Sequence, residues 1–202
     1  MRAAQAPDAT SPAKATGSDA VKAALIEAAG ELLGEVGPRG VSVRDIAQRA
    51  GVNHGQIHHY FGGKRGLLEA AIRHLARGHY AHSLELAGGR PIPRALSLSE
   101  DRPYFRALCQ SVMDGDLELV RAVESDDELS VPRRVMRDLQ GRHPQGDELE
   151  VKAHFANLAA MQLGWVAFEE LLFLNAQVGP DQRESFRETV KRLMQEMIDR
   201  AP

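Results

Sequence analysis

The sequence predicts an all-α fold. From residue 19 onwards, apolar side chains recur three and four positions apart, which is the spacing of one face of a helix. Alternation of apolar and polar residues, which is typical of a half-buried strand, never extends beyond a few positions. Glycine and proline interrupt the helical pattern at intervals, so we expect a series of separate helices in this chain of 202 residues.

Local signals place the ends of these helices. Residues 1–18 are rich in Ala, Pro, Ser and Thr and are expected to form a disordered tail. Ser42 and Asn53 are suitable N-caps for two short helices, and Gly51 is a suitable C-cap for the first of them. The expected helices cover residues 19–36, 43–50, 54–60, 64–87, 104–113, 117–123, 131–139, 147–178 and 182–200.

The charge of the chain is unevenly distributed. There are 25 basic and 28 acidic residues, which gives a formal net charge of −3. Residues 39–80, in contrast, contain 7 basic and only 2 acidic side chains, a local charge of +5. A pair of helices that serves only as packing has no need of this excess, so this region is a candidate for binding a polyanion.

Other classes of protein are excluded by simple observations. Cys109 is the single cysteine, so no internal disulfide can form, and we expect a reducing, cytoplasmic location. The longest uncharged stretch, residues 153–168, is 16 residues long and contains polar side chains. Because a membrane-spanning helix needs about 20 apolar residues, we expect no membrane association.

The segment 43–62, VRDIAQRAGVNHGQIHHYFG, has the pattern of a helix-turn-helix. Such a motif needs a small residue where its helices touch and a glycine at the tight turn, and Ala47 and Gly51 meet these needs. Ile46, Val52 and Ile57 are spaced to hold the two helices together. The second helix would then present polar side chains to the major groove of DNA, where Gln and His can bond base edges.

The same segment resembles the DNA-binding domain of the tetracycline-repressor (TetR) family of bacterial transcriptional regulators. The positions that match the family pattern are Ser42, Ile46-Ala47, Ala50-Gly51-Val52, Gly55, His58–Phe61, Lys64 and Leu67-Leu68. Two positions depart from it: His58 stands where the family usually has a phosphate-contacting Tyr, and Gly63 stands where Ser, Asp or Asn usually begins the fourth helix.

A set of DNA-contacting residues follows from the pattern and the resemblance. His54, Gln56 and His59 are expected to read bases. Five others are expected to hold phosphates: Ser42, Arg44, His58, Tyr60 and Lys64. Asn53 and Gly55, at the start of the second helix, complete the predicted surface.

The resemblance also implies two domains and a symmetric assembly. Residues 19–65 would form the helix-turn-helix domain, and residues 66–202 a larger helical domain that binds a small effector and dimerises through its last two helices. Residues 156–175 are apolar almost all round, which is typical of a helix that packs on both its own domain and a partner. A homodimer would suit a palindromic operator. The resemblance therefore implies a ligand-responsive repressor.

An effector pocket is expected among the apolar side chains of the C-terminal helices. The candidate lining residues are Tyr104, Phe105, Leu108, Cys109, Met113, Phe155, Met161, Trp165 and Phe168. Their large apolar groups and few charges suit an apolar or amphipathic ligand.

An alternative hypothesis is a small-molecule-binding or metal-dependent helical protein whose helix-turn-helix is only structural. His54 and His58, and likewise His79 and His82, are spaced to share one helical face. However, the sequence contains no HExxH or CxxC motif and no nucleophile elbow. We therefore expect no metal, no cofactor and no catalytic residue.

Overall fold

The computed structural model describes residues 17–89, 94–97, 99, 101–142 and 147–199, and over these residues the chain is helical and contains no strand. The predicted all-α fold is confirmed. The elements are α1 (Ser18–Gly40), α2 (Val43–Arg49), α3 (Gly55–Phe61), α4 (Lys64–Ala87), α5 (Arg102–Met113), α6 (Leu117–Glu124), α7 (Val131–Arg142), α8 (Glu148–Asn175), the 3₁₀ turn η1 (Pro180–Gln182) and α9 (Arg183–Asp199).

Most helix ends lie within two residues of their predicted positions because local caps define them. Asp147 caps α8 by accepting a hydrogen bond from the Leu149 amide, and Gly88 ends α4 in the left-handed conformation. The predicted tail falls outside the described residues up to residue 16, and α1 begins at Ser18. Parts of the predicted loops, residues 90–93 and 143–146, also lie outside them.

The first helix is longer than expected because it bends rather than stops at Gly37. This residue has φ 71° and ψ 170°, and the helical path resumes for one short turn up to Gly40. A Cβ atom on Gly37 would lie 2.6 Å from Asp114 Oδ2, which accepts a hydrogen bond from the Arg39 amide. The bend therefore joins the end of α1 to the loop after α5.

Two hydrophobic cores organise the helices. The first joins α1–α6 and the residues just after α6, and its fully buried members include Leu33, Ile46, Ile57, Ile72 and Leu119. The second lies between α8 and α9 and the segment before α5; it includes Leu96, Trp165, Phe173 and Met194. Because α4 is part of the first core along with α1, the division into domains at residue 65 stays a prediction.

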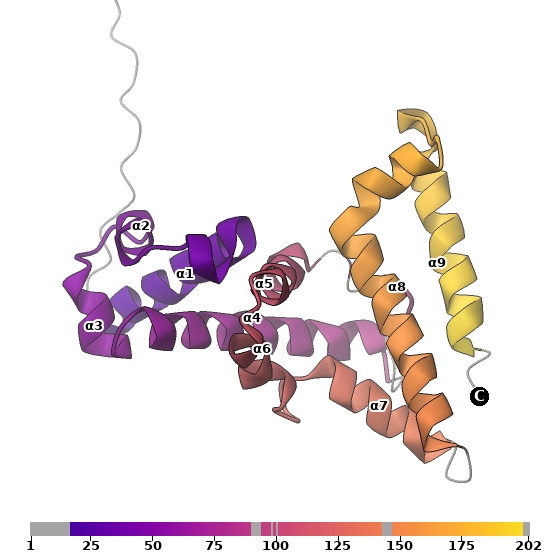
Figure 1. Ribbon diagram of the computed structural model, residues 1–202, viewed down its shortest axis with the longest axis horizontal. Coiled ribbons are helices and arrows are strands. Elements are labelled where there is room, and N and C mark those ends of the chain that lie inside the picture. Colours follow the sequence, from indigo (N-terminus) through magenta and orange to yellow (C-terminus); the bar gives the residue numbers. More distant parts are fainter. Residues whose placement is uncertain (1–16, 90–93, 98, 100, 143–146, 200–202) are drawn as a thin grey trace, which may run out of the picture.

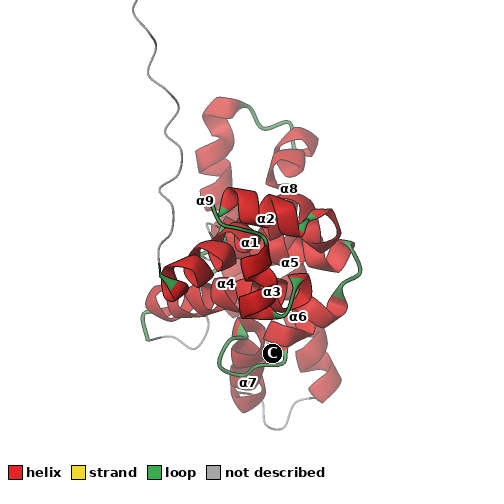
Figure 2. Ribbon diagram, turned by 90° about the vertical axis from the view of Figure 1, so that its left-hand side faces the viewer, coloured by secondary structure: helices red, strands yellow, loops and turns green. Residues whose placement is uncertain are grey.

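Helix α4 connects the two ends of the molecule (Figure 1). It runs from the end that carries α2 and α3 toward the end that carries α8 and α9, which lie side by side. Figure 2, turned by 90°, shows α1, α2 and α3 together at the end that faces the viewer. Among the described helices, none is both long enough and apolar enough to cross a membrane.

Candidate nucleic-acid interface and ligand cavity

The helix-turn-helix is built by local hydrogen bonds and a small apolar core. Ser42 and Asp45 form a capping box at the start of α2, in which the Asp45 amide donates to Ser42 Oγ at 3.1 Å. The Asn53 side chain accepts from the Gly55 amide at 2.8 Å just before α3, but the N-cap of α3 is His54 and not Asn53 as predicted. Ile57 turns inward and is fully buried. These contacts fix which face of α3 is turned outward.

The outward face of α3 carries the side chains predicted to read bases. His54 and His59 are exposed, as are Gly55 and His58, and Gln56 is half-buried. Tyr60 is also half-buried: its ring lies against His59 and under the ammonium group of Lys22 in α1. The structure therefore places Gln56 and His59 on α3 and His54 at its N-cap.

Of the residues expected to hold phosphates, Arg44 and Lys64 have no ion pair with any described residue, and Arg44 is exposed. Arg49, by contrast, forms two hydrogen bonds to Glu35 of α1, at 2.6 and 2.9 Å. These bonds hold the pKa of Glu35 below its usual value. The hydroxyl of Ser42 is engaged with Asp45, so a phosphate contact by Ser42 requires the capping box to open.

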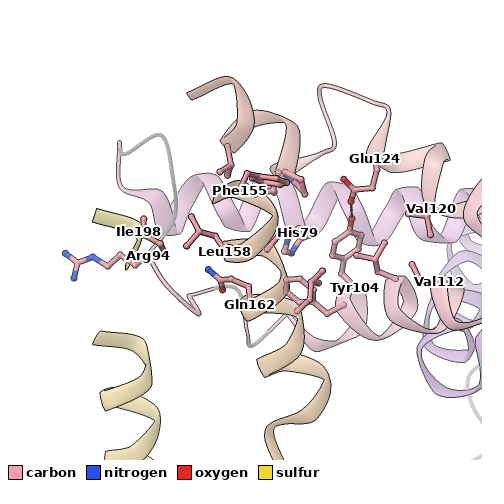
Figure 3. Close-up of a pocket in the computed structure, with 17 residues that line it drawn as sticks. His79, Arg94, Tyr104, Val112, Val120, Glu124, Phe155, Leu158, Gln162 and Ile198 are labelled. Atoms are coloured by element: carbon pink, nitrogen blue, oxygen red, sulfur yellow. Dashed lines mark hydrogen bonds between the residues drawn. The ribbon is translucent and has the colours of Figure 1, made fainter. Parts of the chain in front are cut away.

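A cavity of about 390 Å³ lies beside the middle of α4 (Figure 3). Its volume is typical of a site for a small molecule. The lining side chains come from α4 to α9 and from the segment before α5: His79, Arg94, Tyr104, Phe105, Leu108, Val112, Val120, Glu124, Val131, Pro132, Val135, Phe155, Leu158, Ala159, Gln162, Leu163 and Ile198. The wall is predominantly aliphatic and aromatic.

Four of the predicted lining residues do line this cavity: Tyr104, Phe105, Leu108 and Phe155. The other five do not line this cavity, so their part in ligand binding stays a prediction. Trp165 and Met161 pack in the second core instead. Met113, at the end of α5, is 82% exposed, and Phe168 is 55% exposed where α8 departs from helical geometry. Cys109 is half-buried outside the cavity, and burial raises the pKa of its thiol.

The polar residues of the cavity were not predicted from the sequence. His79 continues the buried stripe of α4, seven residues after Ile72 and three after Ala76, so helical periodicity was a signal for its burial. Glu124 and Gln162 lie on other helices, and nothing local in the sequence marks them. In the structure, Tyr104 donates a hydrogen bond to Glu124 at 2.9 Å, shown as a dashed line in Figure 3. Burial, followed by the nearby Glu124 carboxylate, strongly raises the pKa of Tyr104.

An ion pair joins the start of α4 to the start of α6. Arg65 Nη1 lies 2.8 and 2.7 Å from the two oxygens of Asp116, which also caps α6 through the Leu119 amide at 3.1 Å. Burial alone would raise the pKa of Asp116, but the bonds from Arg65 and Leu119 outweigh it, so the pKa lies below its usual value. Since α6 contributes Val120 to the cavity wall, the pair links that wall to the helix that follows α3.

The histidine pairs do not form a metal centre within the described parts of the chain. There, no group of three or more His, Cys, Asp or Glu side chains is arranged to hold a metal ion. His79 directs Nδ1 to Asp101 at 2.8 Å rather than sharing a ligand site with His82.

Comparisons with known proteins agree with this geometry. The profile of "Bacterial regulatory proteins, tetR family" matches residues 25–71. Over 187 residues the chain is 31% identical to the "HTH-type transcriptional repressor Rv3405c" of Mycobacterium tuberculosis, covering 89% of this chain and 92% of that protein. The "HTH-type transcriptional regulator BetI" of Yersinia pestis is 41% identical over 92 residues, which are 45% of this chain and 42% of that protein. A solved tetR-family regulator from Streptomyces coelicolor superposes with a TM-score of 0.54 at 19% identity, covering 91% of this chain and 79% of that one.

The fold and the exposed helix α3 thus define a helix-turn-helix regulator of transcription that binds DNA. The chain belongs to the tetR family of bacterial regulatory proteins. The relatives are named as transcriptional regulators, which favours a DNA-binding role for the helix-turn-helix over the alternative that it is only structural.

Proposed function

We propose that the chain is a cytoplasmic repressor that binds a palindromic operator as a homodimer and is released by a small apolar or amphipathic effector. The observation that carries this proposal is the presence of two separate sites in one chain. An exposed, polar helix α3 lies at one end of α4, and a largely apolar cavity lies beside the middle of α4. The cavity suits an effector, because its size and apolar wall match those of small-molecule sites.

Helix α3 of each subunit would enter the major groove, with half-sites about 34–36 Å apart. His54, Gln56 and His59 would contact base edges. Arg44 and Lys64 are the main phosphate ligands in this proposal, since neither has an ion pair with another described residue. Asn53, Gly55, His58 and Tyr60 would contribute the rest of the surface, with Ser42 acting mainly through the start of α2.

The dimer would form on an apolar face that α8 and α9 leave uncovered. Its exposed large side chains are Phe168, Leu171 and Leu174 on α8 and Leu193 and Met197 on α9. They follow helical spacing on both helices, so they form a stripe on each. Exposed large apolar side chains on two neighbouring helices are typical of a protein interface.

Effector binding would act on α3 through α6 and α4. Filling the cavity moves the wall that α6 provides, and the Asp116–Arg65 pair carries that movement to the start of α4. Only the glycines 62 and 63 separate α4 from α3. A coupling of about 1–3 kcal/mol between the two sites is enough to release the operator.

The experiment is selection of duplex DNA from a random pool by the purified protein. The expected product is an inverted repeat bound by one dimer. In the variant Gln56→Ala, discrimination at one position of each half-site should fall by about 1–3 kcal/mol. Gln140→Ala, on the exposed side of α7, is the matched control and should leave discrimination unchanged. If Gln56→Ala and Gln140→Ala select the same sequence as the parent with equal affinity, Gln56 does not read the bases.

A further inference from the structure

The polar side chains that line the cavity differ in whether their hydrogen bonds are already made. The Tyr104 hydroxyl donates to Glu124 Oε1, and Glu124 Oε2 accepts from the Ser130 hydroxyl at 2.7 Å. Both carboxylate oxygens of Glu124 are therefore engaged. Arg94 is exposed, and its guanidinium points away from the other labelled side chains in Figure 3. The Tyr104 hydroxyl hydrogen therefore needs no acceptor from a ligand, and the Arg94 guanidinium does not reach the other labelled side chains.

His79 is the first exception. Its ring is 4% exposed, stacks on Tyr104 with 4.4 Å between ring centroids, and directs Nδ1 to Asp101 Oδ2 at 2.8 Å. Because an ionised carboxylate only accepts, Asp101 fixes the hydrogen on Nδ1. In the neutral ring the other nitrogen, Nε2, carries a lone pair, and it has no hydrogen-bond partner among the described residues. It offers the cavity one oriented hydrogen-bond acceptor.

Gln162 of α8 is the second exception. Its Oε1 accepts from the Leu96 amide at 3.0 Å, which fixes the orientation of the side-chain amide. The Nε2 group is left with two hydrogens and no partner among the described residues. It offers the same cavity a hydrogen-bond donor, and Figure 3 shows both side chains among those lining it.

We infer that the effector is an uncharged, mainly apolar molecule that carries a hydroxyl group, such as a phenol. The hydroxyl hydrogen would donate to His79 Nε2, and a hydroxyl oxygen would accept from Gln162 Nε2. The cavity of about 390 Å³ lies within the range of sites for small molecules. This inference rests on the proposed function, since it names the ligand of the proposed effector site.

Other ligand chemistries fit the cavity less well. A pure hydrocarbon leaves both free groups unpaired in an apolar site, which costs affinity. A carboxylate brings its lone pairs toward the lone pair of His79 and the charge of Glu124.

The test is calorimetric binding to the full chain without DNA, using four compounds with the same apolar body: biphenyl, 4-hydroxybiphenyl, 4-methoxybiphenyl and biphenyl-4-carboxylate. We expect 4-hydroxybiphenyl to bind about tenfold or more tightly than the other three, because the methoxy compound lacks the donor. Equal affinity of the hydroxy and methoxy compounds, tightest binding of the carboxylate, or no binding of any compound overturns the inference.

Two variants separate the role of Nε2 from that of the ring. His79→Asn keeps a donor near Asp101 but removes the atom that reaches the cavity, whereas His79→Gln places an amide near the position of Nε2. The tenfold advantage of the hydroxyl should fall to about twofold or less in His79→Asn and persist in His79→Gln, with biphenyl affinity similar in both. Persistence of the full advantage in His79→Asn contradicts the inference. Release of operator DNA is measured separately: a phenol that binds and does not release DNA contradicts the proposed function alone.

Discussion

Gly66 is the position in α4 where the structure leaves no room for a side chain. A Cβ atom built at this position lies 2.1 Å from the backbone oxygen of Phe61, the last residue of α3, where real Cβ contacts are essentially never shorter than 3.0 Å. Gly66→Ala must therefore push α3 and α4 apart by about 0.9 Å. Backbone cannot rotate away as a flexible side chain can, so we expect a cost of about 2–3 kcal/mol.

The better helix propensity of alanine offsets about 1 kcal/mol of this cost, which leaves Gly66→Ala about 1–2 kcal/mol less stable than the parent. In a chain of this length the melting temperature should fall by about 2–8 °C. Gly78→Ala is the matched control, because it lies in the same helix with no atom within 4 Å of the place its new methyl group would occupy, and it should gain about 1 kcal/mol. Operator affinity should fall about tenfold or more in Gly66→Ala only, because α3 is displaced. A Gly66→Ala protein as stable as Gly78→Ala, with parental affinity, refutes the reasoning.

Two further predictions concern α8 and α9. Glu169 accepts hydrogen bonds from Arg187, and this contact most strongly lowers its pKa; its stabilising effect is thus present above pH ~4.3 and is lost as the pH falls through the lowered value. In urea unfolding at fixed protein concentration, Glu169→Gln should cost about 2 kcal/mol at pH 7, and this cost should shrink steadily as the pH is lowered below ~4.3. Glu184→Gln, on the exposed side of the same arginine, should cost little at any pH. Leu171→Asp should weaken the dimer in sedimentation velocity and lower operator affinity. Leu117→Asp, a leucine equally exposed (50% against 49%) on α6, should do neither, and equal sedimentation of the two variants argues against the proposed interface.

The elements of the fold were predictable because their signals are local. Ser42 and Asp147 accept hydrogen bonds from amides three and two residues away, so the sequence alone marks the starts of α2 and α8. The outward face of α3 was predictable for the same reason, since Ile57 fixes the inward face and the remaining positions follow from the helical repeat.

The cavity was only partly predictable, because it depends on contacts between distant segments. Trp165 and Phe168 lie three positions apart on α8, yet one is buried in the second core and the other is exposed. The backbone departs from helical geometry at Phe168, the exposed residue of the two, with φ −127° and ψ 19°. No residue pattern in the sequence predicts this departure. The pairing of His79 with Asp101 likewise joins residues 22 positions apart, and only the tertiary structure shows that it faces a cavity.

The measurement that tests the central claim most directly is the salt dependence of operator binding by the parent and by two arginine variants. Arg44 lies on the α2–α3 surface with no ion pair to another described residue, and Arg192 is equally cationic but lies on α9. We predict that Arg44→Ala weakens operator binding and makes the slope of log K against log salt less steep. The slope should change by about 0.9 for each phosphate that is no longer neutralised, or about two units per dimer. Arg192→Ala should retain the parental slope. Equal slopes for the parent and Arg44→Ala would contradict the assignment of this surface as the one that binds DNA.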